Sequence, residues 1–312
     1  MITGKTTKIP LIICAGPTAS GKTALSAELA LRLGGEIISA DSMQIYKYMD
    51  IGTAKPTENE KRGVPHHLMD FVSPTEDYSL ADYAAAAHRV IKDVYSRGKL
   101  PIMVGGTGLY IDTVAENISL EGPGEDKSLR KELEKTAKEK GNAFVHKMLE
   151  SIDPESYKRL HENDLKRVIR AIEIYKLTGR TIGEYNRESR KGKQLYAPLG
   201  FIIEWDRETL YERIDKRVDE MLEAGLPCEV KRLLDMGLTA ENTAMQAIGY
   251  KELAEYLEGK CSLDTATENI KRESRRYAKR QITWFKRKNY IRLSPETAAD
   301  DAEKIIKERF GL

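Results

Sequence analysis

Short apolar runs alternate with helical periodicity along most of the chain. Four of these runs have the length and composition of buried strands, at residues 9–15, 36–40, 100–104 and 199–205. Helical patterns follow the first run at residues 24–30 and precede the third from Tyr78 to Arg97. Strands that alternate with helices are typical of a parallel sheet with helices packed on it, so the pattern predicts an α/β fold.

A different pattern fills residues 120–195, where the sequence is charged and helical. Helices are predicted at residues 126–140, 144–152 and 163–175, and the last has an apolar stripe with basic side chains on the opposite face. Residues 186–194 resemble a polar connector. We therefore predict an all-helical insertion at residues 120–195 within a P-loop-type parallel sheet core built from residues 1–119 and 196–312. Two further helices, at residues 210–222 and 229–236, and a basic helix from Asn269 to Trp284 complete that core.

A glycine-rich segment joins the first strand to the first helix. It reads Gly-Pro-Thr-Ala-Ser-Gly-Lys-Thr and has P-loop spacing at Gly16, Gly21, Lys22 and Thr23. Glycines let backbone N–H groups turn toward an anion, and the helix N-terminus adds about half a positive charge. Lys22 can supply an ammonium and Thr23 a hydroxyl ligand for magnesium. A chance glycine-rich turn is the alternative, but the flanking strand and helix favour a phosphate cradle.

Two other predicted strands also end in segments that can carry chemistry. Residues 41–46, Asp-Ser-Met-Gln-Ile-Tyr, follow the second strand, and Gly105, Gly106, Thr107 and Gly108 follow the third. The carboxyl ends of parallel strands meet at one edge, so Asp41 is expected near the cradle. Its alternative roles are a helix N-cap or a water-mediated magnesium partner. The glycine cluster lacks the dinucleotide spacing, which argues against a nicotinamide cofactor.

Charge is unevenly distributed along the chain, although the net charge is only +2. Residues 271–290 carry +8 and residues 158–193 carry +6, so the remainder carries −12. This indicates a polyanionic partner. No apolar run approaches the roughly 20 residues of a membrane span, and the beginning of the chain lacks a signal-peptide pattern, so we expect a cytoplasmic protein with no membrane partner. The three cysteines are expected to be reduced, and the pair His66–His67 is expected to be structural or to contact substrate.

Six segments together resemble the tRNA dimethylallyltransferase family, and the resemblance covers nearly the whole chain. The second, third and last of them are the most restrictive, whereas the first is shared by many nucleotide-binding enzymes. In chain order they are Gly-Pro-Thr-Ala-Ser-Gly-Lys-Thr, Asp-Ser-Met-Gln-Ile-Tyr, Gly-Gly-Thr-Gly-Leu-Tyr, Asn-Asp-Leu-Lys-Arg-Val-Ile-Arg-Ala, Ile-Gly-Tyr-Lys-Glu and Ala-Lys-Arg-Gln-Ile-Thr-Trp-Phe.

The resemblance implies transfer of a dimethylallyl group from dimethylallyl diphosphate to the exocyclic amine of the adenosine 3′-adjacent to the anticodon, with release of diphosphate. It assigns Asp41 as the base, Thr107 as a hydrogen-bonding group at the reacting centre and Arg217 as a charge-neutralising group. Magnesium on Thr23 is the implied cofactor. The implied diphosphate site is the whole loop: Gly16, Pro17, Thr18, Ala19, Ser20, Gly21, Lys22 and Thr23.

The resemblance also implies binding of the tRNA anticodon stem-loop, by a chain that we expect to be a monomer. The target base must be flipped out of its stack, and Tyr250 and Trp284 are candidate stacking platforms or, alternatively, core residues. Basic side chains, with the run at residues 286–288, are the candidate phosphate contacts. The implied tRNA-binding residues are Asp41, Ser42, Met43, Gln44, Thr107, Arg130, Lys166, Arg167, Arg170, Gly249, Tyr250, Lys279, Arg280, Gln281 and Trp284.

Two alternative functions share some of these features. A P-loop nucleoside or small-molecule kinase would have the same cradle and could use Arg213 and Arg217 as lid arginines, but it needs neither the segment at residues 41–46 nor the one at 105–110. An RNA-binding module with a vestigial P-loop would need no catalytic carboxylate at Asp41.

Overall fold

The computed structural model describes residues 8–120, 122 and 124–312. The chain divides into two compact units, one built from Met1–Glu116 with Gln194–Leu312 and the other from Asn117–Lys193. These divisions lie within a few residues of the boundaries predicted from the change in composition. The expectation that the beginning of the chain lacks a signal peptide concerns mainly residues 1–7, which lie outside the described residues.

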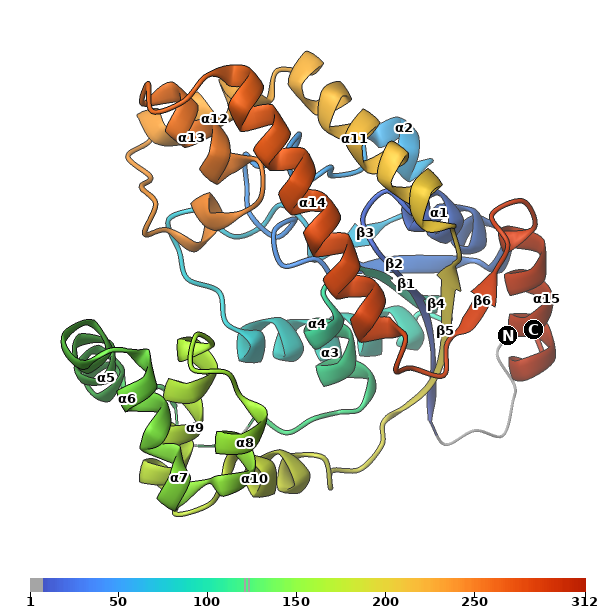
Figure 1. Ribbon diagram of the computed structural model, residues 1–312. Coiled ribbons are helices and arrows are strands. Elements are labelled where there is room, and N and C mark those ends of the chain that lie inside the picture. Colours follow the sequence, from blue (N-terminus) through green and yellow to red (C-terminus); the bar gives the residue numbers. More distant parts are fainter. Residues whose placement is uncertain (1–7, 121, 123) are drawn as a thin grey trace. The chain divides into compact units, whose positions relative to one another are not determined.

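The first unit is built on a parallel sheet of six strands, which confirms the predicted α/β class (Figure 1). The spatial order is β3-β2-β4-β1-β5-β6, and every pairing is parallel. The four long apolar runs all form strands, whereas the two short edge strands β3 and β6 were not predicted. The strands are β1 (Ile9–Ala15), β2 (Gly35–Ser39), β3 (His66–His67), β4 (Leu100–Gly105), β5 (Tyr196–Ile203) and β6 (Ile291–Leu293).

The strand register brings three chemistry-bearing segments to one edge of the sheet. Ala15 at the end of β1 pairs with Gly105 at the end of β4, and Ser39 at the end of β2 pairs with Val104. The glycine-rich loop, the segment after residue 40 and the second glycine cluster therefore begin side by side. This is the edge at which ligands of open α/β sheets bind.

Helices cover both faces of this sheet. Side chains alternate along a strand, so one face of the central strands packs against α1 and α15, where Leu29 and Ile306 are fully buried. The other face carries α3 and α4, whose Tyr83 and Tyr110 rings stack with centroids 3.8 Å apart. These helices are α1 (Lys22–Leu33), α3 (Leu80–Ser96), α4 (Gly108–Ala115) and α15 (Ala298–Phe310).

A second apolar cluster lies beyond the carboxyl edge and packs the segment that follows β2 against helices from the last third of the chain. Ile45, Met49, Val230 and Leu233 belong to it. The predicted long excursion after residue 52 contains a short helix that begins with a capping box at Thr57. The elements here are α2 (Glu58–Lys61), α11 (Arg207–Glu223), α12 (Leu226–Asp235), the 3₁₀ turn η1 (Thr243–Gln246), α13 (Tyr250–Leu257) and α14 (Leu263–Phe285).

The second unit is all-helical, as its composition predicts. Its core is formed by apolar residues such as Leu133, Val145 and Ile172, contributed by three different helices. The expected connector at residues 186–194 is partly helical, because Thr181 and Glu184 form a capping box that starts a helix there. The helices are α5 (Lys127–Lys140), α6 (Asn142–Lys147), α7 (Leu149–Ile152), α8 (Pro154–Arg159), α9 (Leu165–Thr178) and α10 (Ile182–Ser189). Across the described parts of both units, none of the helices has the length and apolarity that a membrane span requires.

Candidate active site

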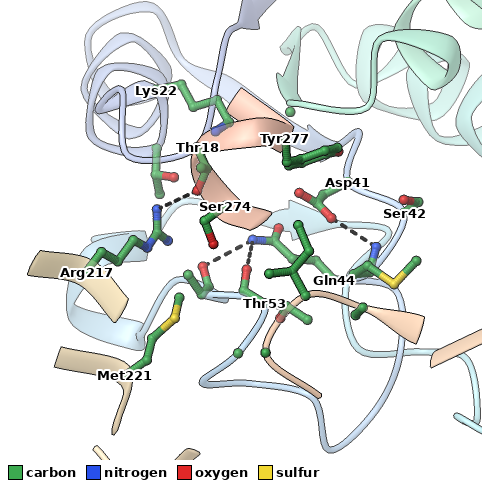
Figure 2. A pocket seen from close by; sticks show the side chains of 18 of the residues that line it. Thr18, Lys22, Asp41, Ser42, Gln44, Thr53, Arg217, Met221, Ser274 and Tyr277 are labelled. Atoms are coloured by element: carbon green, nitrogen blue, oxygen red, sulfur yellow. Dashed lines mark hydrogen bonds between the residues drawn. The ribbon is translucent and has the colours of Figure 1, made fainter. Parts of the chain in front are cut away.

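A cavity of about 340 Å³ opens at the carboxyl edge of the sheet, within the first unit. The glycine-rich loop contributes Lys22 and Thr23 to its wall, and the segment after β2 contributes Asp41 and Gln44 (Figure 2). Helices α11 and α14 each line the cavity with side chains from one helical face. Their residues in the wall are Ile214, Arg217, Val218 and Met221 from α11, and Ile270, Ser274, Tyr277, Arg280 and Gln281 from α14.

The glycine-rich loop has the backbone conformation of a phosphate-binding turn. Gly16 has a φ of 147° and Gly21 a φ of 89°, both in the region that favours glycine. Ala19 also has a positive φ, of 60°, which costs a residue with a Cβ about 1 kcal/mol. Ser20 is 1% exposed, and its buried hydroxyl has no hydrogen-bond partner among the described residues. A strained turn around an unsatisfied buried hydroxyl is suited to a polar ligand.

Lys22 is a half-buried cation at the N-terminus of α1. Its Nζ donates to the carbonyl oxygen of Pro17 at 3.0 Å, across the loop. Desolvation, with a smaller contribution from the nearby Arg217, lowers the pKa of Lys22 to about 8, although Asp41 opposes the shift. The first turn of α1 contains no acidic residue. The loop therefore presents positive charge and a helix N-terminus to the cavity, which favours an anion.

Two hydrogen bonds from the chain that follows β5 hold the outer side of the loop. Trp205 Nε1 donates to Ser20 O at 3.0 Å, and Arg213 Nε donates to Ala19 O at 2.9 Å. The guanidinium of Arg213 also lies over the Trp205 ring, 4.4 Å from its centroid. Arg217, one turn later, faces the cavity and lies 3.5 Å from Thr18 Oγ1; burial lowers its pKa. Arg213 is thus a support for the loop, whereas Arg217 can reach a ligand.

Asp41 lies in a turn that is tied to the second glycine cluster. Its Oδ1 accepts the Met43 N–H at 2.9 Å, and no helix begins after it, so the alternative role as a helix N-cap is wrong. Thr107 Oγ1 accepts the Ser42 N–H at 3.1 Å, and Thr107 N donates to Ala40 O at 3.2 Å. A Cβ on Gly105 would lie 2.1 Å from Ala40 O, so glycine is needed for this close approach. The three predicted segments therefore meet around one cavity.

Gln281 lies between the two glycine-rich segments rather than on the surface. It is 5% exposed; its Oε1 accepts the Thr18 N–H at 3.0 Å, and its Nε2 donates to Gly106 O at 3.0 Å. A Cβ on Gly106 would lie 2.0 Å from that nitrogen. The prediction that Gln281 contacts tRNA did not foresee this internal bridge, which uses the side-chain amide within the protein.

Of the two candidate stacking platforms, one is buried and one is accessible. Tyr250 is 0% exposed and its hydroxyl donates to Glu229 Oε1 at 2.6 Å, so the proposal that its ring stacks on a base is wrong; the neighbouring Gly249 does line the cavity. Trp284 is 38% exposed. Its Nε1 donates to Asp112 Oδ2 at 3.1 Å, which fixes the orientation of the indole. Stacking on Trp284 stays a prediction.

The basic residues of the first unit differ in exposure and in whether an acidic side chain already pairs with them. Lys279 and Arg280 are exposed on α14, and Arg280 also lines the cavity. In the run at residues 286–288, Lys288 is paired with Asp112 at 2.8 Å and with Glu116 at 2.9 Å. Lys286 and Arg287 are exposed.

In the second unit, a buried glutamate divides the predicted basic residues into two kinds. Glu173 is 0% exposed; Arg130 binds it through both Nε and Nη2 at 2.8 Å, and Arg170 pairs with it as well. Burial alone would raise the pKa of Glu173, but the bonds from the two arginines outweigh it and lower that pKa. Lys166 is exposed, and Arg167 is exposed beside Asp164. Arg130 and Arg170 thus have a structural partner, which their charge did not reveal.

Two residues at or near the cavity, Tyr277 and Glu229, were not predicted from the sequence, and a third, His66, was expected to be structural or to contact substrate. Among the described residues that line the cavity, Tyr277 is the one Phe, Tyr or Trp side chain. Burial, with Asp41 nearby, raises the pKa of its hydroxyl to about 12. The His66 Nδ1 bonds to Val64 O, and the buried Nε2 has no partner within the part of the chain that the structure describes. Glu229, 6% exposed, accepts the Asp50 N–H at 2.9 Å behind the cavity wall. An acid on the apolar stripe of a helix was the signal for Glu229.

Comparison with known proteins places the chain in a family. The model of the IPP transferase family matches residues 44–288. The tRNA dimethylallyltransferases of Carboxydothermus hydrogenoformans and Acetivibrio thermocellus are each 51% identical to this chain. The alignments cover 96% of both chains for the first and 95% of both chains for the second.

Solved structures give the same result. The tRNA isopentenylpyrophosphate transferase of Bacillus halodurans is 42% identical, with a TM-score of 0.72 over 97% of both chains. A eukaryotic dimethylallyltransferase acting on tRNA is 33% identical, with a TM-score of 0.76 over 95% of this chain and 75% of that one. Sequence and fold therefore agree that the chain belongs to the IPP transferase family, the family of the tRNA dimethylallyltransferases.

Proposed function

We propose that the protein transfers a dimethylallyl group from dimethylallyl diphosphate to the exocyclic amine of the tRNA adenosine 3′-adjacent to the anticodon, with release of diphosphate. The observation that carries this proposal is one cavity lined by both the cation of a phosphate-binding loop, Lys22, and a carboxylate, Asp41. The relatives that match over nearly their whole length support it, because they are named for this transfer to tRNA.

The donor half of the reaction needs positive charge where the leaving group forms. The loop at residues 16–23 would hold the diphosphate through its backbone N–H groups, with Lys22 and Arg217 facing the negative charge. The unpartnered hydroxyl of Ser20 supports this assignment, because a phosphate oxygen would satisfy it. As the allylic carbon–oxygen bond breaks, its electron pair leaves with the diphosphate, and these cations stabilise it.

Magnesium fits this site through the substrate rather than through a protein cage. The described residues contain no cluster of three or more His, Cys, Asp or Glu side chains that could hold a metal ion. Thr23 lines the cavity at the start of α1, so its hydroxyl together with diphosphate oxygens would form the ligand set. When bound, the ion would supply further neutralisation of the leaving diphosphate.

The acceptor half needs a base, because an adenine amine is a weak nucleophile until it loses a proton. Oδ1 of Asp41 accepts the Met43 N–H, so the lone pairs of Oδ2 would take the amine proton. The amine nitrogen then forms its bond to the allylic carbon while the bond to diphosphate breaks. Thr107, tied to Ser42 beside Asp41, would hydrogen-bond at the reacting centre.

Binding of the anticodon stem-loop would offset the cost of flipping the target base, a few kcal/mol. Exposed basic side chains are the proposed phosphate contacts, and Trp284 the proposed stacking surface, worth about 1 to 3 kcal/mol per base. We further propose that the protein acts as a cytoplasmic monomer. The proposed phosphate contacts are Lys166, Arg167, Lys279, Arg280, Lys286 and Arg287.

A direct test uses the purified protein, magnesium, dimethylallyl diphosphate and an anticodon stem-loop. Mass analysis of the nucleosides should detect one dimethylallyl group on the target adenosine. A parallel reaction with ATP addresses the kinase alternative, which family membership does not favour. Production of ADP without prenylated RNA would contradict the proposed function. Full cellular function of an Asp41→Ala protein would instead favour an RNA-binding module.

A further inference from the structure

Glu229 is a buried carboxylate on the apolar face of α12, outside the set of residues discussed for catalysis. Its neighbours on that face, Leu226, Val230 and Leu233, are each 0% exposed, and Glu229 itself is 6% exposed. A carboxylate is costly to bury unless its oxygens accept hydrogen bonds. The hydrogen-bond donors to the Glu229 carboxylate therefore indicate its structural role.

Four donors converge on the two oxygens of Glu229. Oε2 accepts the N–H groups of Asp50 and Ile51, each at 2.9 Å. Oε1 accepts the N–H of Gly52 at 3.1 Å and the hydroxyl of Tyr250 at 2.6 Å. Three consecutive backbone N–H groups thus point at one carboxylate, so the path of residues 50–52 depends on it.

The segment has little freedom beyond these bonds. A Cβ on Gly52 would lie 2.5 Å from the Tyr250 ring and 2.8 Å from Leu226, so the backbone is packed directly against the helices. At the other end Lys55, with a side chain 9% exposed, pairs with Asp50 at 2.7 Å and donates to Tyr46 O at 2.6 Å. The intervening carbonyl groups are therefore held in fixed directions.

Those carbonyls determine which hydrogen bonds Gln44 can offer to a ligand. Gln44 lines the cavity, and its Nε2 donates to Thr53 O and Ala54 O, both at 3.1 Å (Figure 2). Its Oε1 accepts the Ser39 hydroxyl at 3.2 Å. An amide has two N–H donors, and both are used here. Toward the cavity the side chain retains only the second lone pair of Oε1.

We propose that Glu229 is a positioning residue which, through residues 50–54, makes Gln44 an acceptor-only reader of the target base. The inference rests on the proposed function. An adenine amine carries two hydrogens. Asp41 removes one as a proton, and Gln44 Oε1 accepts a hydrogen bond from the N–H that remains. A purine with a carbonyl oxygen at the same position, such as guanine or hypoxanthine, presents an acceptor to an acceptor and is rejected.

The test measures base preference with two anticodon stem-loops that differ only in adenosine or inosine at the target position. Dissociation constants are compared for the full-length protein. We expect the unaltered protein to prefer adenosine about tenfold, since a site built for one hydrogen-bond pattern rejects the opposite one. In Glu229→Gln, an amide N–H faces backbone N–H groups, residues 50–54 lose their anchor, and the preference should fall to the part that the Asp41 carboxylate alone maintains.

Three matched measurements separate positioning from general damage. Asp235→Asn, an exposed carboxylate on the same helix, should keep the preference. Gln44→Met should reduce the preference to the same level, and adding Glu229→Gln to it should change the preference no further, because Glu229 acts through Gln44. The KM for dimethylallyl diphosphate should stay unchanged in Glu229→Gln. If that variant does not fold, Tyr250→Phe removes one of the four donors and should reduce the preference partially.

The inference is overturned if Glu229→Gln weakens both stem-loops equally, or if it alters the preference in the Gln44→Met background. It is also overturned if Tyr250→Phe folds with its preference intact. Failure of the proposed function gives a different result, because the unaltered protein would then not prenylate the adenosine stem-loop at all.

Discussion

Glu229 in the first unit and Glu173 in the second are both buried carboxylates, and they have different kinds of partner; the first unit also buries Glu36, which pairs with Arg97. In the first unit Glu229 is bonded by neutral donors, three backbone N–H groups and a tyrosine hydroxyl. In the second unit Glu173 is bonded by Arg130, by Arg170 and by the Asp126 N–H. The first carboxylate orders a backbone segment beside the cavity, whereas the second removes two arginines from the set of freely available cations. A positive charge counted in a sequence is therefore available to RNA only if no buried acid already holds it.

The largest effect is expected at Asp41, where the first unit would carry chemistry as well as structure. Asp41→Asn retains an oxygen for the Met43 N–H but cannot accept a proton at neutral pH. Single-turnover transfer should fall by about 10²- to 10⁴-fold, whereas the dissociation constant of the stem-loop should change little. Equal loss of binding and transfer would show that the carboxylate is structural, like Glu173, and the contrast between the units would weaken.

The second prediction concerns the stability of the helical unit. Glu173→Leu leaves Arg130 and Arg170 without their shared partner and the Asp126 N–H without an acceptor. We expect the unfolding free energy to fall by about 2 to 3 kcal/mol, because breaking a buried pair leaves uncompensated charge. Denaturant unfolding followed by amide exchange of residues 127–178 would measure it. Exchange in the first unit serves as the internal control, and equal protection in both proteins would contradict the prediction.

The third prediction uses the depressed pKa of Lys22. Below a pH of about 8 the free protein carries the ammonium, and above it the neutral amine, so donor binding should weaken as the pH rises. The kcat/KM for dimethylallyl diphosphate, with tRNA saturating, should fall about tenfold per pH unit on the basic side. Lys22→Arg is the matched control, because a guanidinium does not lose its proton there and the limb should disappear. A flat profile for the unaltered protein would exclude Lys22 as the titrating group.

The smallest effects are expected from exposed basic residues of the second unit. Lys166→Ala and Arg167→Ala should each weaken stem-loop binding severalfold and reduce the slope of log Kd against log salt by about one. Lys135→Ala, an equally exposed lysine on another helix of the same unit, provides the comparison. Unchanged slopes in the first two variants would mean that exposure, like charge, does not identify the phosphate contacts.

The sequence predicted the centre of the fold because the strand pattern and the strand ends obey local rules. Four apolar runs formed four strands, and the parallel register brought Asp41 and Thr107 to the glycine-rich loop, as the rule for strand ends requires. The two short edge strands were not predicted, because β3 and β6 have only two and three residues and no periodicity of their own.

What the sequence could not supply was the identity of hydrogen-bond partners far apart in the chain. Tyr250 was a candidate stacking platform or, alternatively, a core residue, and the structure shows the second: its ring packs against Gly52 and its hydroxyl bonds Glu229. Arg130 and Arg170 were expected to contact RNA from the family resemblance, and Arg170 also from its place opposite an apolar stripe. Neither argument identifies the buried acid that pairs with both side chains. The binding roles proposed for the exposed residues stay predictions.

The bridge made by Gln281 has a consequence for how variants of this protein should be interpreted. Its side chain belongs to the helix that also carries Lys279 and Arg280, yet it joins a backbone N–H 263 positions earlier in the chain to the turn at Gly106. A genetic screen that measures defects in RNA binding and defects in donor binding separately would therefore place substitutions in this part of α14 into two classes. Substitutions of neighbouring residues would appear as RNA phenotypes, and a substitution of Gln281 would appear as a phenotype of the small-molecule donor.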